Sequence, residues 1–434
     1  MKGKHYNKLI ALTLTVTLFA ITIMLPNTTF AAVETSVETA IIVDVESGRV
    51  LYDKNADEAL PPASMTKMMT EYIVLEKVND GELDWEDTTE ISDYAYDLSA
   101  DNRFSGIGLR KNVEYKVKDL YDAMAIYSDN ATTVALAEMI SGSEGEFVKL
   151  MNQKGEELGL PDFKFVNATG LDNDTLNGNH PEGTKAEDTN LLSARSAALL
   201  AYHLVVDYPE VLEVASIPSK EFDGQMLTNY NWMLKHDASF IDQFYYEGVD
   251  GLKTGNTELA GKTFTGTAEK DGRRLITVVM KADSEVERFQ ETAKLLDYGF
   301  DDFEQAELLP SNSVIEEHEN LAVTKGKEDH VNIATAEAID LMIEKGTEED
   351  YSVIFELDES KLDDDGNLEA PVKKGDKVGQ ATITYDEKPL TKSDYLVDDK
   401  AVIAVDVIAT EDVEKKNWFS LTIDSVVDFF KNLF

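Results

Sequence analysis

The chain has 434 residues, of which 43% are hydrophobic, and this is enough for two or three domains with sizeable apolar cores. Its 84 acidic residues against 40 basic ones give a net charge of −44, and so acidic a surface argues against nucleic-acid binding. The chain has no cysteine, which excludes disulfides, thiolate catalysis and cysteine-ligated metals.

Residues 1–31 have the layout of a secretory signal peptide. Three lysines precede an uncharged apolar run from Leu9 to Leu25, and Thr29 and Ala31 fit cleavage after Ala31. Cleavage after Ala32, or retention of the run as an uncleaved signal anchor, are the alternatives. In each case we expect the body of the protein to be exported from the cytoplasm.

A first domain, residues 33–303, is predicted from strands that flank a helical middle. Strands are expected at 40–45, 50–52, 262–268 and 274–280, the last two joined by an Asp271-Gly272 turn. Helices are expected from Ser64 to Leu75 and over 117–127, 131–140, 144–158, 193–206 and 285–298, with a surface loop at 170–188. This order predicts an α+β or three-layer α/β/α domain.

The remaining chain predicts two further units. Residues 304–410 contain short strand-like runs, such as 352–355 and 401–405, between Gly, Asp and Lys turns, which is typical of a small β-sandwich. The turn 363–366 is acidic but lacks the spacing of a calcium loop, and the six histidines lack ligand spacing. We therefore expect no metal site and no cofactor.

Residues 411–434 predict a C-terminal amphipathic helix. Its apolar face consists of Phe419, Ile423, Val426, Val427, Phe430 and Phe434. We interpret it as a helix that lies in a membrane interface, and the alternative is a helix docked on the protein's own core. Because the helix has few Lys or Arg residues, membrane binding would depend on apolar area more than on anionic lipid.

Three short motifs suggest the chemistry. They are Ser64-Met65-Thr66-Lys67, Ser128-Asp129-Asn130 and Lys253-Thr254-Gly255. Each is a weak signal alone, but in this order they form the signature of penicillin-binding proteins and class A β-lactamases. Acyl transfer on a peptide carbonyl or a β-lactam is therefore the leading hypothesis.

Each motif residue has a plausible chemical role. Lys67 lies one helical turn after Ser64, and it can deprotonate the serine if burial or a nearby cation lowers its pKa. Ser128 can relay a proton to the leaving amine, and Asn130 can orient Lys67 and a substrate amide. Lys253 and Thr254 can bind a substrate carboxylate. Gly255, without a side chain, allows a peptide to pair along the Lys253 strand.

At these residues the chain resembles the low-molecular-mass penicillin-binding proteins that are serine-type D-alanyl-D-alanine carboxypeptidases, most of all the vegetative enzymes of Bacillus-type bacteria. The resemblance is carried by residues 63–67, 167–171 and 250–255 and extends over nearly the whole chain. It implies a penicillin-recognising serine transferase fold and removal of the terminal D-alanine from peptidoglycan stem pentapeptides. It also implies acylation by β-lactam antibiotics and a location at the outer face of the cytoplasmic membrane, on the cell-wall side.

The resemblance also implies roles for individual residues. Ser64 forms the acyl-enzyme, Lys67 accepts its proton, Ser128 assists proton transfer, and Lys253 binds substrate. Backbone N–H groups of Ser64 and Asn256 correspond to the family's oxyanion hole, and Arg288 to an arginine near its carboxylate site. Asp129 departs from the small residue that relatives often have, and we expect it to point away from the pocket.

Two other functions compete with this one. A class A β-lactamase needs a glutamate for deacylation, but neither Glu182 nor Glu187 begins the E-x-x-L-N arrangement of those enzymes. The extra domain and tail also fit that class poorly. A non-catalytic envelope protein that binds wall peptides is the second alternative, and the intact Ser64 and Lys67 argue against it.

Overall fold

The computed structural model describes residues 33–237, 240–315 and 318–423. The predicted signal peptide, residues 1–31, and the end of the predicted tail helix, residues 424–434, lie outside the described residues. The chain divides between Glu34 and Thr35 into two units, and the description below concerns residues 35–434.

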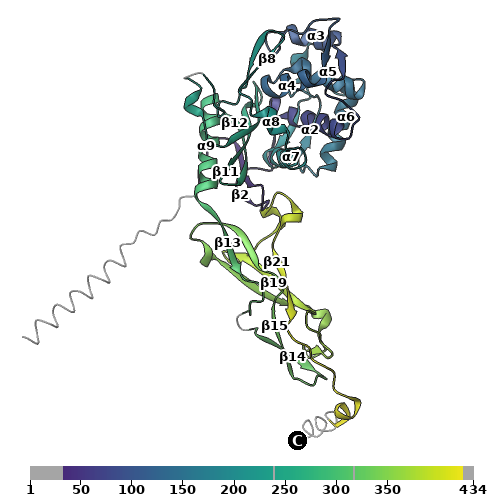
Figure 1. Cartoon of the computed structure of the whole chain (residues 1–434), viewed down its shortest axis with the longest axis vertical. Coiled ribbons are helices and arrows are strands. Elements are labelled where there is room, and N and C mark those ends of the chain that lie inside the picture. Colours follow the sequence, from purple (N-terminus) through teal and green to yellow (C-terminus); the bar gives the residue numbers. More distant parts are fainter. Residues whose placement is uncertain (1–32, 238–239, 316–317, 424–434) are drawn as a thin grey trace, which may run out of the picture. The chain divides into compact units, whose positions relative to one another are not determined.

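A five-stranded antiparallel sheet with the order β10-β11-β12-β1-β2 is the centre of the N-terminal part of this unit (Figure 1). The strands are β1 (Thr39–Asp44), β2 (Val50–Lys54), β10 (Val249–Thr257), β11 (Gly261–Lys270) and β12 (Arg273–Ala282). Asp271 and Gly272 both have positive φ, as a two-residue turn between twisted strands requires. Strand β10 is at an edge, so one side of its backbone is open to a further strand.

Helices cover both faces of this sheet. Figure 1 shows α9 on one face, packed on β11 and β12, and α7 on the other, packed on β12 and β1. The described helices of this part are α2 (Lys67–Asn79), α3 (Asp93–Ala100), α4 (Val117–Tyr127), α5 (Asn130–Ser141), α6 (Glu144–Glu157), α7 (Ala194–Asp207), α8 (Val211–Ala215) and α9 (Glu285–Asp301). The result is the predicted three-layer α/β/α arrangement.

Most predicted elements lie within one to three residues of the observed ones, and side-chain caps explain several helix starts. Ser143, Ser193 and Ser284 each accept a hydrogen bond from the backbone N–H three residues later. The prediction missed α3, α8 and several short strands. These strands are β3 (Ala59–Leu60), β4 (Thr88–Glu90), β5 (Glu114–Lys116), β6 (Phe163–Lys164), β7 (Leu191–Ser193), β8 (Ser219–Phe222) and β9 (Gln225–Thr228).

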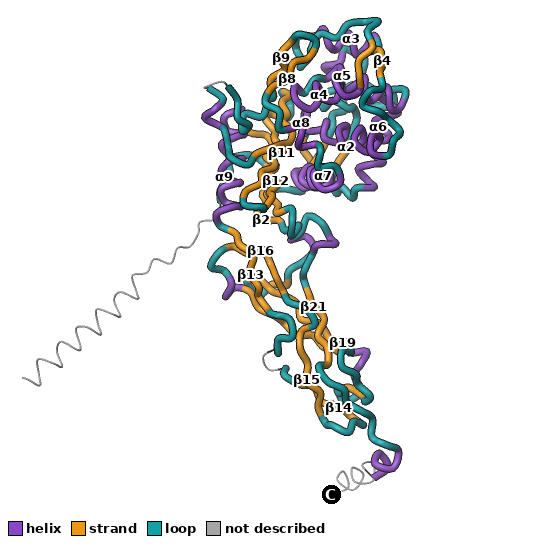
Figure 2. The backbone as a smooth tube through the Cα atoms, viewed as in Figure 1, coloured by secondary structure: helices purple, strands orange, loops and turns teal. Residues whose placement is uncertain are grey.

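The C-terminal part is rich in strands, as Figure 2 shows. A pair, β13 (Phe303–Leu309) and β16 (Ile339–Glu344), and a larger sheet with the order β17-β19-β21-β15-β14-β18 share one apolar core. The other strands are β14 (Asn320–Thr324), β15 (His330–Thr335), β17 (Tyr351–Leu357), β18 (Leu368–Glu369), β19 (Lys377–Tyr385), β20 (Lys388–Pro389) and β21 (Ala404–Ala409). The strand predicted at 401–405 was placed too early, because pairing with β19 begins only at Ala404.

The described end of the chain is helical from residue 418 to 423. Trp418 and Phe419 are 77% and 60% exposed. Of the helices within the described ranges, none has the length and apolar character needed to cross a bilayer.

Candidate active site

Ser64 lies in the 3-10 turn η1 (Ala63–Thr66), which leads directly into α2, and Lys67 is the first residue of that helix. The Lys67 side chain is fully buried. Its Nζ lies 3.1 Å from Ser64 Oγ, 2.9 Å from Asn130 Oδ1 and 2.7 Å from the Thr169 carbonyl oxygen. The amine is therefore fixed beside the serine hydroxyl by two further acceptors.

The second motif lies at the junction of two helices. Ser128 ends α4 in the left-handed conformation, and its buried Oγ has no hydrogen-bond partner among the described residues. Asp129 caps α5, because its carboxylate accepts a hydrogen bond from Thr132 N at 2.7 Å. Burial raises the pKa of this carboxyl group to about 6. Asn130 contacts Lys67 through Oδ1 and donates from Nδ2 to the Ser105 carbonyl at 3.1 Å.

The third motif lies on the edge strand β10. A side chain at Gly255 would place its Cβ 2.3 Å from Thr263 Oγ1 and 2.5 Å from the Pro62 carbonyl oxygen. Packing against the turn that carries Ser64 therefore requires glycine here, a reason different from the predicted strand pairing. Arg288, from α9, donates from Nη1 to the Gly255 carbonyl at 3.0 Å, while its Nε has no partner in the described part of the chain.

These elements enclose a cavity of ≈ 200 Å³. The predicted residues that line it are Ser64, Ser128, Asn130, Thr254, Gly255, Asn256 and Arg288. Lys67 does not line the cavity, but its Nζ contacts two of the lining residues, Ser64 and Asn130. Lys253 is only 3% exposed and does not line the cavity, and its Nζ donates to the Thr254 carbonyl at 3.3 Å.

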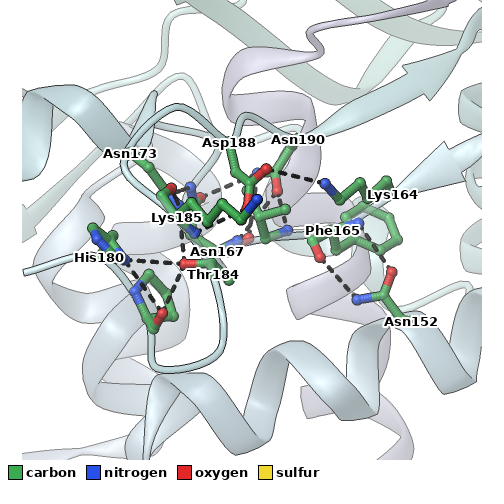
Figure 3. A network of polar contacts seen from close by, with 12 residues as sticks. Asn152, Lys164, Phe165, Asn167, Asn173, His180, Thr184, Lys185, Asp188 and Asn190 are labelled. Atoms are coloured by element: carbon green, nitrogen blue, oxygen red, sulfur yellow. Dashed lines mark hydrogen bonds and ion pairs between the residues drawn. The ribbon is translucent and has the colours of Figure 1, made fainter.

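The loop 167–171 holds Lys67 from the far side, and no role was predicted for it. Asn167 Oδ1 accepts from Gly170 N at 2.7 Å and from Thr169 N at 3.2 Å, while Asn190 Oδ1 accepts from Val166 N at 2.6 Å. Figure 3 shows Asn167 and Asn190 within the surrounding network of polar contacts. Because it fixes the loop, it also fixes the Thr169 carbonyl that contacts Lys67. The only sequence signal was the run of amide and hydroxyl residues itself.

Buried ionisable groups set the electrostatics of the site. Burial lowers the pKa of Lys67 well below its usual value, and the charge of Lys253 lowers it further. Burial also lowers the pKa of Lys253 to about 8 and raises the pKa of Glu71 and of Glu144 to about 7. Neither glutamate was predicted as part of the site. Glu71 follows Lys67 by four residues, but this spacing alone does not distinguish a buried carboxylate from a surface one.

Comparison with known proteins identifies the family. The family model for D-alanyl-D-alanine carboxypeptidases, peptidase S11, matches residues 26–284, and the model for the C-terminal domain of penicillin-binding protein 5 matches residues 303–415. The chain belongs to the D-alanyl-D-alanine carboxypeptidase family. As a member of it, the chain is a serine peptidase with a β-rich C-terminal part.

Individual relatives support the family over almost the whole length. The chain is 32% identical over 396 residues to D-alanyl-D-alanine carboxypeptidase DacF of Bacillus subtilis, covering 91% of this chain and 90% of the relative. It is 30% identical over 420 residues to DacC of Escherichia coli, covering 96% and 94%. The solved structure of PBP3 from Streptococcus pneumoniae aligns with a TM-score of 0.65 at 33% identity, covering 88% of this chain and all of that one.

A further structure relates the family to β-lactams. Penicillin-binding protein D2 of Listeria monocytogenes, solved in its cefotaxime-bound form, aligns with a TM-score of 0.53 at 32% identity. The alignment covers 62% of this chain and 99% of that protein.

Proposed function

We propose that the chain removes the terminal D-alanine from peptidoglycan stem pentapeptides through an acyl-enzyme on Ser64, and that β-lactams acylate the same serine. One observation carries the proposal: Lys67 Nζ lies 3.1 Å from Ser64 Oγ, in a fully buried position that lowers the lysine pKa. A buried neutral amine beside a hydroxyl is positioned to act as a general base that accepts the hydroxyl proton.

The proton path follows from the contacts of Lys67. A neutral amine has two N–H donors, which Asn130 Oδ1 and the Thr169 carbonyl accept. Its lone pair is then directed at Ser64 and receives the proton as Oγ attacks the carbonyl carbon. Ser128, which lines the cavity, donates its hydroxyl proton to the leaving D-alanine amine and takes up the proton held by Lys67, so both side chains return to their starting states.

Substrate binding is assigned to the β10 wall. Thr254 lines the cavity, and Lys253 directly behind it supplies positive charge for the free carboxylate of the terminal D-alanine. Arg288 adds a second buried cationic group, a guanidinium, to the cavity wall. The open edge of β10 can pair with the substrate backbone, and the backbone N–H groups of Ser64 and Asn256 form the oxyanion hole.

The rest of the stem peptide needs room beyond the cavity. A groove of ≈ 760 Å³ shares Arg103, Phe104, Leu171 and Asn256 with the cavity wall, and it is the natural place for the acyl part of the substrate. Glu187 lines that groove but not the cavity that contains Ser64, and Glu182 lines neither the groove nor the cavity. A β-lactamase needs its deacylating glutamate beside the serine, so neither residue fits that role.

A released-product assay tests the function. Purified protein is incubated with a pentapeptide ending in D-Ala-D-Ala, and free D-alanine is measured beside the Ser64→Ala variant. We expect release from the wild type alone and covalent labelling of the wild type alone by fluorescent penicillin. Labelling without D-alanine release would favour a non-catalytic envelope protein, and rapid turnover of penicillin would favour a β-lactamase.

We also propose that the protein is exported and attached to the membrane. The exported protein would have three parts: a catalytic domain, residues 33–303; a β-rich domain, residues 304–410; and a tail helix, residues 411–434. Removal of residues 1–31 changes the net charge from −44 to −47, so anionic lipid repels the body. Apolar burial must therefore provide the attachment, and the exposed Trp418 and Phe419 support this.

Membrane co-sedimentation across a salt series tests the attachment. Full-length protein should stay bound as salt rises, because salt screens repulsion and leaves apolar burial intact. A form lacking residues 412–434 should remain soluble and still hydrolyse small peptides. If the truncated form still pellets, the N-terminal segment is the anchor instead.

A further inference from the structure

Glu71 is a buried carboxylate without a role in the mechanism above. It follows Lys67 by four residues on α2, so both side chains project from the same face of the helix. Glu71 is 3% exposed, its Oε1 accepts no hydrogen bond, and its carboxylate forms no ion pair with any described residue. Burial of such a group is costly, so folding alone does not explain it.

Helix α2, which carries Lys67 and Glu71, packs against β10, which carries the buried Lys253, and against α4, which carries the buried Tyr121. The charge of Glu71 acts on all three of these side chains. Of the charges that act on Lys253, Glu71 has the largest effect and raises its pKa, while Arg288 lowers it. Glu71 therefore acts on Lys253 as the main counter-charge.

Lys67 has different surroundings. The charge of Lys253 has the largest effect on it and lowers its pKa. Three carboxylates act in the opposite direction, in the order Asp129, Glu71 and Glu144, so Glu71 is only one of several influences.

The proposed function requires opposite states of these two lysines. Lys67 must be neutral to accept the serine proton, whereas Lys253 must be cationic to attract a carboxylate. Both are buried, and burial alone would drive both toward the neutral form. A negative charge that acts mainly on one of them separates their states.

We propose, on the basis of the proposed carboxypeptidase function, that Glu71 is a positioning residue for charge: its buried carboxylate keeps Lys253 protonated for substrate binding while Lys67 remains neutral as the base. Ionised Glu71 and cationic Lys253 then attract each other across the contact between α2 and β10, without forming a direct ion pair. The positive charge of Lys253 in turn disfavours protonation of Lys67. The fully buried, unpartnered carboxylate is thus explained by the site it faces.

The test is the pH dependence of kcat/KM for a peptide ending in D-Ala-D-Ala with a free carboxylate. The wild type should lose activity at low pH as Lys67 is protonated, and at high pH as Lys253 loses its proton near pH 8. In Glu71→Gln the alkaline limb should move to lower pH by on the order of one pH unit. Activity then falls about eightfold at pH 8.5 but less than about twofold at pH 6.5.

Glu144→Gln is the matched control. Glu144 is also buried, with a pKa raised to about 7, and it acts on Lys67 but is not among the charges acting on Lys253. Its substitution should move the acid limb to lower pH and leave the alkaline limb in place. Glu71→Asp, which keeps the charge, should retain the wild-type alkaline limb.

Two results would overturn the inference. One is an alkaline limb in Glu71→Gln that coincides with the wild type, with activity lowered equally at every pH, as a structural role predicts. The other is an equal shift of that limb in Glu144→Gln. If Glu71→Gln does not fold, Glu71→Met removes the charge without burying a polar group, and the same limb is measured.

The outcome is separable from the proposed function. Penicillin also carries a carboxylate, so its acylation rate constant reports the same two limbs even if no D-alanine is released. Absence of D-alanine release by the wild type would reject the proposed function, whereas an unmoved limb in acylation by Glu71→Gln would reject the role of Glu71 alone.

Discussion

Substitution of Gly170 by alanine tests how Ser64 is positioned. Gly170 has φ +85°, and an added Cβ would lie 1.8 Å from the Ala63 carbonyl oxygen and 3.0 Å from Ser64 N. Contacts below 3.0 Å do not persist, so the loop or the η1 turn must move by more than 1 Å. Either movement changes the geometry of the nucleophile or of the Thr169 carbonyl that contacts Lys67.

The cost has two parts. A left-handed conformation at a residue with a Cβ costs about 1–2 kcal/mol of folding free energy. A displacement of about 1 Å at reacting groups costs roughly 10²-fold in rate, or about 2.7 kcal/mol of transition-state stabilisation. We therefore expect Gly170→Ala to lower the penicillin acylation rate constant about 100-fold and the melting temperature by several degrees.

Gly178→Ala separates these two parts. Gly178 lies in the same surface loop with φ +87°, but no atom lies within 4 Å of its added Cβ. It should show the conformational cost alone, as a lower melting temperature with an unchanged acylation rate constant. Unimpaired acylation in Gly170→Ala, or an equal loss in Gly178→Ala, would refute the reasoning.

Three further outcomes follow from the contacts of the site. Lys67→Ala should lower penicillin acylation by about 10²–10⁴-fold with the circular dichroism spectrum retained, because it removes the general base. Amidation of the terminal D-alanine should lower kcat/KM by a factor that corresponds to about 2–5 kcal/mol of transition-state stabilisation. Lys253→Ala should abolish this preference for the free acid over the amide. Equal turnover of acid and amide by the wild type would contradict the role of Lys253. Asn190→Ala should lower both melting temperature and acylation, since it leaves buried groups unpaired at about 1–3 kcal/mol each. Asn152→Ala, which frees the Phe165 backbone instead, should lower the melting temperature alone.

The helices and motif residues were predictable because local signals mark them. The helix at 117–127 was predicted with the bounds of α4, since its periodic apolar face ends at Ser128, a residue type common at caps and turns. The strand at 401–405 was misplaced, because an apolar run gives no information about which partner strand fixes its register. Local patterns thus locate helices better than strands that pair with distant segments.

The buried carboxylates illustrate the limit for the site. In a chain with 84 acidic residues, each is expected on the surface unless a partner is known, and no sequence pattern reports that Glu71 and Glu144 are buried beside Lys67. A second requirement for glycine at position 255 was missed for a related reason. Its small size is required by the Pro62 carbonyl, which lies close in space but almost 200 positions away in sequence.

Two glycines from distant segments hold the turn that carries the nucleophile. Gly170 packs against the Ala63 carbonyl, and Gly255 packs against the Pro62 carbonyl and Ala63 Cβ, so neither has room for a side chain. The turn therefore has little freedom to adjust when Ser64 reacts, which lowers the reorganisation needed to reach the transition state. In contrast, Ser128 and Arg288 line the cavity, and Ser128 Oγ and Arg288 Nε have no hydrogen-bond partner within residues 33–237, 240–315 and 318–423. A substrate forms hydrogen bonds with both groups only when it is correctly placed between them, so binding and correct placement reinforce each other.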